Sequence, residues 1–484
     1  MTPPLVGILG DTLGDPYSLR IIEGAFQRFS RLGYNAVGLA GGFPSAPLFQ
    51  SEGSPVFPSA LDALVLLSET LDNGDRALQE AVNNSRATVV SIGVELARTT
   101  VVRVNDEVGI LQAFAHLVKR HDCRTIAFIA GPERSQDSQR RLDAYRAALS
   151  DFGLPFDPTL VVRGDYEARS GHEAVHTLRQ RKNRGFDAIL AANDLMAIGA
   201  IDGLKAQGIP IPDVVKVVGF DDTAEAAFVA PALTTVKQPI FEQGMASADL
   251  VAKLLAHESP QDATLTSTAL VIRRSCGCHG PDTRRSALTA ATPANERELI
   301  DDAFRKLIRR QLASRRVHTE LSRLAEPVIA ATGFQELAHA MTRVLRLLRP
   351  KRFLLCLYAG SRRHARAVLE FTGREVVFLN ESEQFPVERL FPSGFLKHGG
   401  PAQLLVETLH IGAEHFGYTV TETQDLDPHA HIELRYVLSS ALARIVATRE
   451  LRRLYLLEKN FTQLRRQAEE RASLESVVPP PRDD

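Results

Sequence analysis

Short apolar runs alternate with amphipathic segments along roughly the first half of the chain. The runs are continuous and rich in β-branched residues, which is typical of parallel strands covered by helices on both faces. The segments between them carry apolar residues at helical spacing, as at Ile21, Ile22, Ala25, Phe26 and Phe29. The expected strands are residues 5–9, 34–39, 63–67, 88–92 and 101–105 in a first set, and 125–130, 161–164, 188–192 and 215–220 in a second.

This order predicts an α/β fold. Two consecutive βαβ sets of similar size indicate two Rossmann-like lobes that close on a cleft. The strand at 215–220 ends in the adjacent carboxylates Asp221 and Asp222. In an open α/β sheet, ligands bind beyond the carboxyl ends of the strands, so we expect one of the two carboxylates to face the cleft.

Three strings in this region resemble one known family. The run GFDD is followed by LTTVKQP, the expected strand at 188–192 leads into AANDLMAIGA, and the region closes with RRSCGC. Together they resemble the periplasmic-binding-protein-like sensor domain of LacI/GalR-type regulators, over residues 5–278. The resemblance implies a two-lobed sensor that binds a small polar ligand, most often a sugar, and acts in transcription control.

The resemblance also assigns roles to individual residues. Arg141 matches an arginine that clamps ligand hydroxyls, and a guanidinium offers a rigid fork of donors for hydroxyls or a carboxylate. Asn193 and Asp221 match the ligand-facing amide and carboxylate of the family. Flat aromatic rings pack on the apolar faces of sugars. The expected ligand-binding residues are therefore Asp11, Tyr17, Arg141, Tyr166, Asn193 and Asp221.

Each assignment has a structural alternative. Asp at a strand-to-helix junction commonly caps a helix, so we assign Asp194, Asp222 and Gln238 to structural roles near the cleft. Arg141 is alternatively a surface arginine, as we expect of its neighbours Arg134 and Arg140. Tyr17 and Tyr166 are equally compatible with positions on a lobe surface or a hinge.

The closing string raises the question of a metal. Cys276 and Cys278 flank one glycine, and His279 follows. A structural zinc site needs a second pair of ligands, and neither Cys123 nor Cys356 has suitable spacing. The histidines are scattered singly and are expected to be solvated: His121, His172 and His176. We therefore predict no metal. We also predict no cofactor and no catalytic residue, because the sequence has no GGDEF string, no kinase phosphate-binding box and no coherent catalytic triad.

The second half of the chain reads as a separate set of modules. A helix, a meander of strands and a further long helix resemble an α+β GAF domain. Leu454, Leu457, Phe461, Leu464 and Ala468 follow 3-4-3-4 spacing, which predicts a short coiled-coil seam and a homodimer. The expected divisions are a ligand-sensing domain at 1–279, a linker at 280–293, a connecting helix at 294–332, a GAF-like domain at 333–446, a coiled-coil helix at 447–476 and a disordered tail at 477–484.

Composition narrows the function further. The formal net charge of −1 gives no overall field toward nucleic acid or membranes. The start lacks the features of a signal peptide, no apolar run approaches the ~18 residues of a membrane span, and four cysteines suit a reducing compartment. We expect a cytoplasmic protein without a membrane partner.

The first sensor strand begins at Leu5, so no amino-terminal helix-turn-helix is expected, and direct DNA binding is left open. The sequence thus predicts a non-enzymatic, ligand-sensing regulator with a transcriptional or signalling output. The alternatives are an input module that controls a separate cyclase or kinase through its terminal helix and, third, a solute-binding protein.

Overall fold

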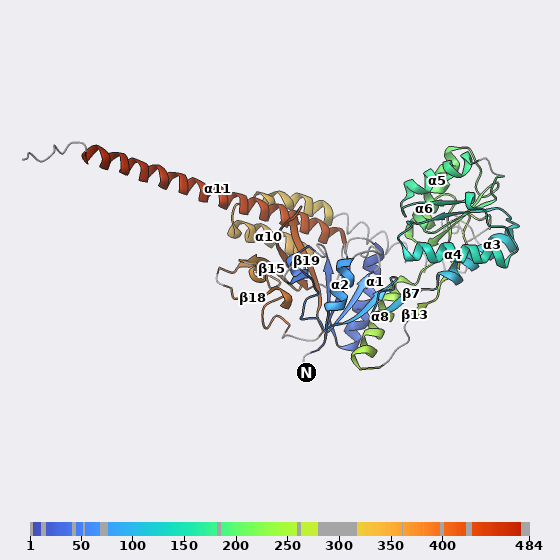
Figure 1. Ribbon diagram of the computed structural model, residues 1–484, viewed down its shortest axis with the longest axis horizontal. Helices are drawn as coiled ribbons and strands as arrows, with labels where there is room; N and C mark the ends of the chain where they lie inside the picture. Colours follow the sequence, from blue (N-terminus) through green and yellow to red (C-terminus); the bar gives the residue numbers. More distant parts are fainter. Residues whose placement is uncertain are drawn as a thin grey trace, which may run out of the picture.

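The computed structural model of this chain combines two α/β lobes, a third α+β domain and one long terminal helix (Figure 1). Its strands form two large sheets and one small hairpin. The structure describes residues 3–10, 16–40, 45–51, 54–67, 76–181, 185–258, 263–278, 317–360, 362–380, 382–396, 401–422 and 428–475.

The first lobe is built on a parallel sheet with strand order β13-β7-β6-β5-β1-β2. Its central strands are fully buried, which explains their continuous apolar sequence. The strands are β1 (Leu5–Gly10), β2 (Asn35–Ala40), β5 (Ala63–Leu67), β6 (Thr88–Ile92), β7 (Thr100–Val104) and β13 (Ala263–Thr266), and the helices are α1 (Pro16–Leu32), α2 (Arg76–Asn84) and α8 (Ile240–Leu255). The hairpin β3 (Gln50–Ser51) and β4 (Ser54–Pro55) follows the 3-10 helix η1 (Pro47–Phe49).

Helices α1 and α8 approach each other closely because each contributes a glycine at the contact. A Cβ on Gly24 would lie 2.1 Å from the carbonyl oxygen of Phe241, and one on Gly244 would lie 2.0 Å from that of Ile21. A larger residue at either position would push the helices apart.

The second lobe has the order β14-β12-β11-β10-β8-β9, parallel except for β14. Figure 1 shows it as a compact green and cyan body beside the first lobe. Its strands are β8 (Ile126–Ala130), β9 (Val161–Arg163), β10 (Ala188–Ala191), β11 (Lys216–Asp221), β12 (Thr234–Lys237) and β14 (Ala269–Val271), and its helices are α3 (Asp106–His121), α4 (Gln136–Asp151), α5 (Ala168–Gln180), α6 (Asp194–Ala206) and α7 (Ala224–Phe228), with the 3-10 helix η3 (Pro158–Leu160).

The chain crosses between the two lobes three times: from β7 to α3, from β12 to α8 and from β13 to β14. Two crossings are joined directly, since Asn105 N donates to Thr266 O at 3.0 Å. Thr268 Oγ1 donates to Asn105 O at 3.4 Å. The two predicted lobes and their order are therefore confirmed.

The third domain contains an antiparallel sheet of order β19-β20-β15-β16-β17, with β18 paired to β16. One face packs against the helix at 317–330, against α10 (Phe334–Leu348) and against the start of α11 (Pro428–Glu475) through residues such as Phe353, Leu355 and Leu438. The strands are β15 (Arg352–Ala359), β16 (His364–Phe371), β17 (Val376–Phe378), β18 (Gln384–Pro386), β19 (Gln403–Ile411) and β20 (Glu414–Glu422), with the 3-10 helix η4 (Val387–Arg389) between β18 and β19.

The first lobe and the third domain share one sheet. Strand β19 pairs in parallel with β2, which makes a continuous sheet of 12 strands. The Asn35 side chain accepts a hydrogen bond from Ala402 N at 2.9 Å, and Ala36 N donates to Ala402 O at 2.9 Å. A common apolar core includes Phe49 and Phe57 of the first lobe and Phe391 and Tyr418 of the third domain. The sequence predicted separate domains here, and nothing local in it indicated this pairing.

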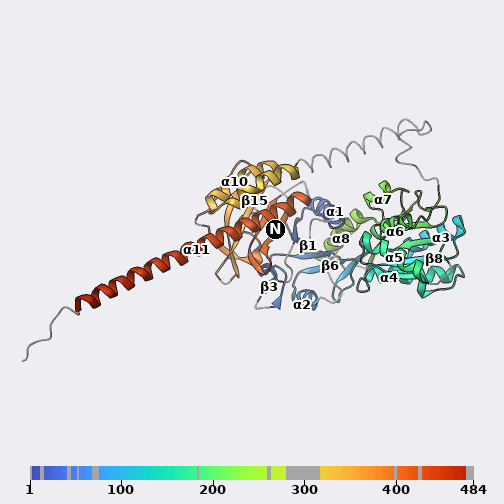
Figure 2. The same ribbon diagram turned by 90° about the horizontal axis from the view of Figure 1, so that it is seen from above.

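Helix α11 runs through the division expected at residue 446, because a single helix spans Pro428–Glu475. It crosses β19 and then extends away from the rest of the molecule (Figures 1 and 2). The expected linker, the first part of the connecting helix up to residue 316 and the tail lie outside the described residues. No helix among the described residues is long and apolar enough to cross a membrane.

The Asn35–Ala402 hydrogen bond gives a test of the shared sheet. We expect Asn35→Ala to lower the free energy of unfolding by about 1–3 kcal/mol, because a buried backbone donor loses its partner. Urea unfolding measures the change, and hydrogen exchange should rise selectively in β2 and β19. Asn84→Ala, at the exposed end of α2, is the matched control. Equal stability of the two variants would show that the Asn35–Ala402 hydrogen bond contributes nothing to stability.

Candidate functional site

Arg141 lies at the centre of a buried polar cluster in the second lobe. Helix α4 carries it, and its side chain is only 4% exposed. Its Nε donates to Asp106 Oδ1 at 2.8 Å, and its Nη1 donates to Ala192 O at 2.6 Å. The guanidinium carbon lies 3.9 Å from the centre of the Phe220 ring, a cation–π contact. The two hydrogen bonds at the edge and the ring against one face fix the orientation of the guanidinium.

Asp221 lies next to this guanidinium, at the end of β11. Its Oδ1 is 3.8 Å from Arg141 Nη1 and accepts a hydrogen bond from Gln238 Nε2 at 2.5 Å. Both Asp221 (φ 121°) and Asp222 (φ 62°) have left-handed backbone conformations. Such conformations cost energy in residues other than glycine, and they tend to occur at functional sites.

The surroundings of this pair shift both pKa values upward. Burial raises the pKa of the Asp221 carboxyl to about 6, although Arg141 opposes the shift. Burial alone would lower the pKa of Arg141, but the carboxylates of Asp106 and Asp221 raise it above its usual range. Arg141 is therefore a permanent cation, whereas Asp221 changes its charge between pH 5 and pH 7.

Asn193 and Tyr166 form a second small network near the end of β10. Asn193 Oδ1 accepts from Met196 N at 3.0 Å and so caps α6, while its Nδ2 donates to Tyr166 O at 2.9 Å. Tyr166 has a left-handed backbone (φ 71°), and its hydroxyl lies 2.9 Å from Ser135 Oγ. Its ring fits against Gly131, where a Cβ would lie 2.4 Å from the ring. Tyr166 is thus held from both ends.

The three residues assigned to structural roles all brace neighbouring segments. Asp194 is fully buried and accepts from Thr223 N at 2.8 Å and Thr235 Oγ1 at 2.5 Å. Asp222 pairs with Arg273 Nη2 at 2.6 Å. Gln238 lies on the crossing from β12 to α8, so its bond to Asp221 connects the cluster to a segment between the lobes.

Comparison with known proteins identifies this region. Residues 114–276 match the family described as periplasmic binding protein-like domain. The chain is therefore similar to periplasmic binding protein-like domains over this part of its length.

Named relatives that the chain matches are transcriptional regulators. The probable HTH-type transcriptional repressor ExuR of Bacillus subtilis (strain 168) is 28% identical over 221 residues, covering 46% of this chain and 66% of that protein. The HTH-type transcriptional regulator CelR of Thermobifida fusca is 35% identical over 185 residues, covering 38% and 54%. AscG of Escherichia coli (strain K12) is 41% identical over 117 residues, covering 24% and 34%. The chain thus spans between about a third and two thirds of the length of these relatives.

Two solved structures are reported as similar to part of this chain. The transcriptional regulator CelR–cellobiose complex has a TM-score of 0.49 and 27% identity, covering 57% of this chain and 86% of that chain. The transcription regulator CcpA of Lactococcus lactis has a TM-score of 0.49 and 22% identity, covering 56% and 99%.

The structure gathers four of the six expected ligand residues of the sensor domain in the second lobe: Arg141, Tyr166, Asn193 and Asp221. Tyr17 lies apart from them, in the first turn of α1, and packs half-buried against the core of the first lobe. Asp11 lies outside the described residues. Which of these six residues contact a ligand stays a prediction.

Two residues of the sensor domain have roles that the sequence did not reveal. Asp106, at the start of α3, is 2% exposed and holds both Arg140 and Arg141. Arg140 was expected to be solvated like Arg134, which is exposed, but its side chain is only 18% exposed. It also donates to Gly93 O of the first lobe at 2.8 Å. The adjacent arginines in α4 were the only sequence signal for this cluster, and their common partner Asp106 lies about 35 residues earlier in the chain.

A second contact joins α4 to the first lobe. Gln136 Oε1 accepts from Glu95 N at 2.9 Å, and Gln136 Nε2 donates to Glu95 O at 3.4 Å. The amino end of α4 therefore holds the segment after β6, in addition to the three chain crossings.

An apolar hollow of about 460 Å³ lies elsewhere, between the helix at 317–330 and α10 of the third domain. Leu324, Pro327 and Ala340 contribute to its lining. It lacks the buried charges of the Arg141 cluster, and we place the candidate site at that cluster.

The raised pKa of Asp221 predicts how stability depends on pH. The carboxyl is protonated more readily in the folded chain than in the unfolded chain, so its contribution is fully present below about pH 4 and is lost as the pH rises through about 6. Asp221→Asn should remove this loss, which amounts to about 3 kcal/mol at most.

Urea unfolding of both proteins from pH 4 to pH 7 measures the difference. Glu225→Gln, at an exposed position in α7, is the control. A constant difference between wild type and Asp221→Asn over this range would contradict the assigned shift.

Proposed function

We propose that this chain is a ligand-sensing regulator. A small polar ligand binds between the two lobes at the Arg141–Asp221 pair, the lobes close, and the change passes through the shared sheet to α11. The observation that carries the proposal is the buried guanidinium of Arg141, oriented by Asp106 and placed beside the strained carboxylate of Asp221.

The free atoms of the cluster suit a ligand with hydroxyl groups. Arg141 Nη2 and Asp221 Oδ2 have no hydrogen-bond partner among the described residues, which leaves one donor and one acceptor side by side. Gln238 Oε1 is buried and likewise has no partner within the described part of the chain. A hydroxyl group both donates and accepts, so a vicinal pair of hydroxyls satisfies all three atoms.

The charge of the cluster favours a neutral ligand. The carboxyl groups of Asp106, Asp137 and Asp221 face the two guanidinium groups of Arg140 and Arg141. The cluster therefore has no excess positive charge with which to hold an acid. We infer that the ligand is a neutral sugar or a similar polyol.

The shared sheet provides a short path from the ligand edge to α11. The β2–β19 register places Glu407 beside Ala40, at the carboxyl end of β2, which is the edge where open α/β sheets bind ligands. Glu407 Oε2 lies 3.4 Å from His431 Nδ1 in the first turns of α11, and both side chains are buried. A movement of this edge would therefore reach α11 through a single strand.

The far part of α11 supports a dimeric output. Leu454 and Leu457 of the expected seam are 54% and 55% exposed, although large apolar side chains are rarely left uncovered along one helix stripe. A second copy of α11 would cover this stripe as a coiled coil. The third domain serves in this proposal as a GAF-like connector between sensor and dimer.

The named relatives favour control of transcription as the output. Control of a separate cyclase or kinase through α11 is the second candidate, supported by the length of that helix beyond the folded body. A solute-binding protein is third. In each case the chain binds a ligand and has no catalytic role. Salt-sensitive binding to duplex DNA would favour the first candidate over the second.

Ligand binding can be tested by a thermal-shift screen of the full chain against neutral sugars, sugar acids and nucleosides. A neutral sugar should raise the melting temperature, because it binds only the folded state. Asp221→Asn should weaken this binding at least tenfold, since the amide presents a donor to the ligand and disturbs the Arg141 pairing.

Glu225→Gln is the control and should bind like the wild type. The proposal of a sugar sensor would be wrong if sugars gave no shift at millimolar concentration, or if Asp221→Asn bound the same sugar unchanged. Sugar acids binding in preference to neutral sugars would contradict the charge argument.

The dimer can be tested at the seam. We expect the Leu454→Glu/Leu457→Glu double variant to be monomeric, because like charges would face each other along the coiled coil. The molar mass in solution, from sedimentation or light scattering, measures the change. Leu456→Glu replaces an equally exposed leucine off the seam, at 57%, and should leave the dimer intact. A monomeric wild type, or a dimeric double variant, would refute the seam.

A further inference from the structure

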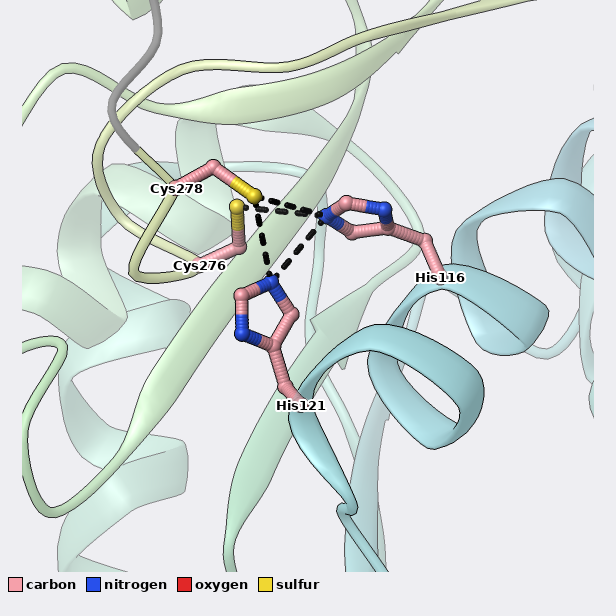
Figure 3. Close-up of side chains that lie close together, drawn as sticks. All are labelled: His116, His121, Cys276 and Cys278. Carbon is pink, nitrogen blue, oxygen red and sulfur yellow. Dashed lines mark hydrogen bonds between the residues drawn. The ribbon is translucent and has the colours of Figure 1, made fainter.

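Four potential metal ligands meet at the carboxyl end of α3 in the second lobe. They are His116 and His121 of α3 and Cys276 and Cys278 of the segment after β14. The four ligand atoms all lie within 4.8 Å of one another. Figure 3 shows both Nε2 atoms and both sulfur atoms turned toward one point.

Local structure brings each pair into position. His116 lies in the last turns of α3 and His121 is its final residue, so both rings project from the same end of the helix. Cys276 and Cys278 lie on either side of Gly277, whose φ of 96° turns the chain so that both thiols face the helix. A side chain at 277 would be strained in this conformation.

Zinc was not expected from the sequence, because Cys123 and Cys356 do not supply a second pair of ligands. The second pair is His116 and His121, which lie about 160 residues away in the sequence. Of these two, His121 was expected to be solvated. His172 and His176 are exposed on α5, as expected. His121 is half-buried and belongs to the cluster.

The distances match a tetrahedral metal site. Zinc binds imidazole nitrogen at about 2.0–2.1 Å and thiolate sulfur at about 2.3 Å, so tetrahedral ligands lie about 3.3 Å apart for N···N and about 3.6 Å for N···S. The two Nε2 atoms are 3.2 Å apart. His116 Nε2 lies 3.4 Å from Cys276 Sγ and 3.6 Å from Cys278 Sγ, and His121 Nε2 lies 3.4 Å from Cys278 Sγ.

A network of hydrogen bonds explains the cluster less well. Each neutral imidazole has one polar hydrogen, which lies on either Nδ1 or Nε2, and a thiol is a weak donor with one hydrogen. The four close contacts above all converge on two Nε2 atoms, so these few hydrogens cannot align with every contact. One cation at the centre satisfies all four atoms at once.

We propose that His116, His121, Cys276 and Cys278 bind one Zn²⁺ ion in a structural site. Two imidazoles and two thiolates are a ligand set typical of closed zinc sites. On binding, each thiol releases its proton to solvent, so the two thiolates balance the charge of the cation. Thr234 Oγ1 lies 3.1 Å from Cys276 Sγ and donates to it, which is the kind of outer hydrogen bond that orients a thiolate ligand.

The position of the site defines its role. It fastens the last segment of the second lobe to the carboxyl end of α3, directly before the chain leaves that lobe toward the third domain. The ion would therefore fix the point from which the connection starts. It lies apart from the Arg141 cluster, and the proposal does not depend on the ligand of the sensor.

The test is the metal content of the full chain, purified without chelator and with its thiols reduced. We expect about one zinc per chain, and a lower melting temperature after removal of zinc by a chelator, because the ion binds the folded state. Replacement with Co²⁺ should give the absorption bands of a tetrahedral site with thiolate ligands. His121→Ala and Cys278→Ser should each lose zinc and the cobalt bands.

Two variants serve as matched controls. His176→Ala removes an exposed histidine of α5, and Cys123→Ala removes a thiol near His121 that does not belong to the four; both should keep zinc. If His121→Ala or Cys278→Ser does not fold, the metal content and the cobalt spectrum of the wild type still test the proposal. A wild type that neither contains zinc nor takes up added Zn²⁺ or Co²⁺ would overturn the proposal, as would full zinc content in Cys278→Ser.

Discussion

The edge of the first-lobe sheet is the constraint on which the arrangement of this molecule depends. Strand β2 would otherwise present a row of unpaired N–H and C=O groups, which promote association with other chains. Strand β19 covers this edge in parallel, with Asn35 completing the pairing at Ala402. The third domain is therefore placed by backbone hydrogen bonds and a common core, and not only by a tether. The direction of α11 follows from this placement.

The second lobe is organised by charge at one end. Asp106 begins α3 directly after one crossing between the lobes, and Gln238 lies on another. Both hold side chains of the Arg141–Asp221 pair, so the pair cannot change its partners without a response from the crossings. A ligand can shift a protein between two conformations only if its contacts differ between them. The hydrogen bonds of Asp106 and Gln238 would connect such a change at the cluster to the crossings between the lobes.

Much of the fold follows from local sequence. The buried strands of both lobes appear as continuous apolar runs, and β5 and β6 have the expected bounds. The contacts that could not be predicted join segments distant in sequence. Three such contacts are the pairing of β2 with β19, the common partner of Arg140 and Arg141, and the approach of His116 to Cys276. They depend on tertiary packing, which the local spacing of apolar residues does not predict. Asp194 accepts a hydrogen bond from Thr223 N and Asp222 pairs with Arg273, and their structural roles stay a prediction.

The late position of β19 in the sequence has a consequence for how the protein is made. During synthesis, β1, β2, β5 and β6 emerge early, but their sheet gains β13 only after both lobes have been translated and β19 later still. Pairing between such distant segments forms slowly, because the intervening chain must close a large loop first. The nascent first lobe thus passes through a period with β2 uncovered, when a strand from another nascent chain can occupy the place of β19. Chaperone dependence and domain-swapped assemblies are the failures to which this topology is exposed.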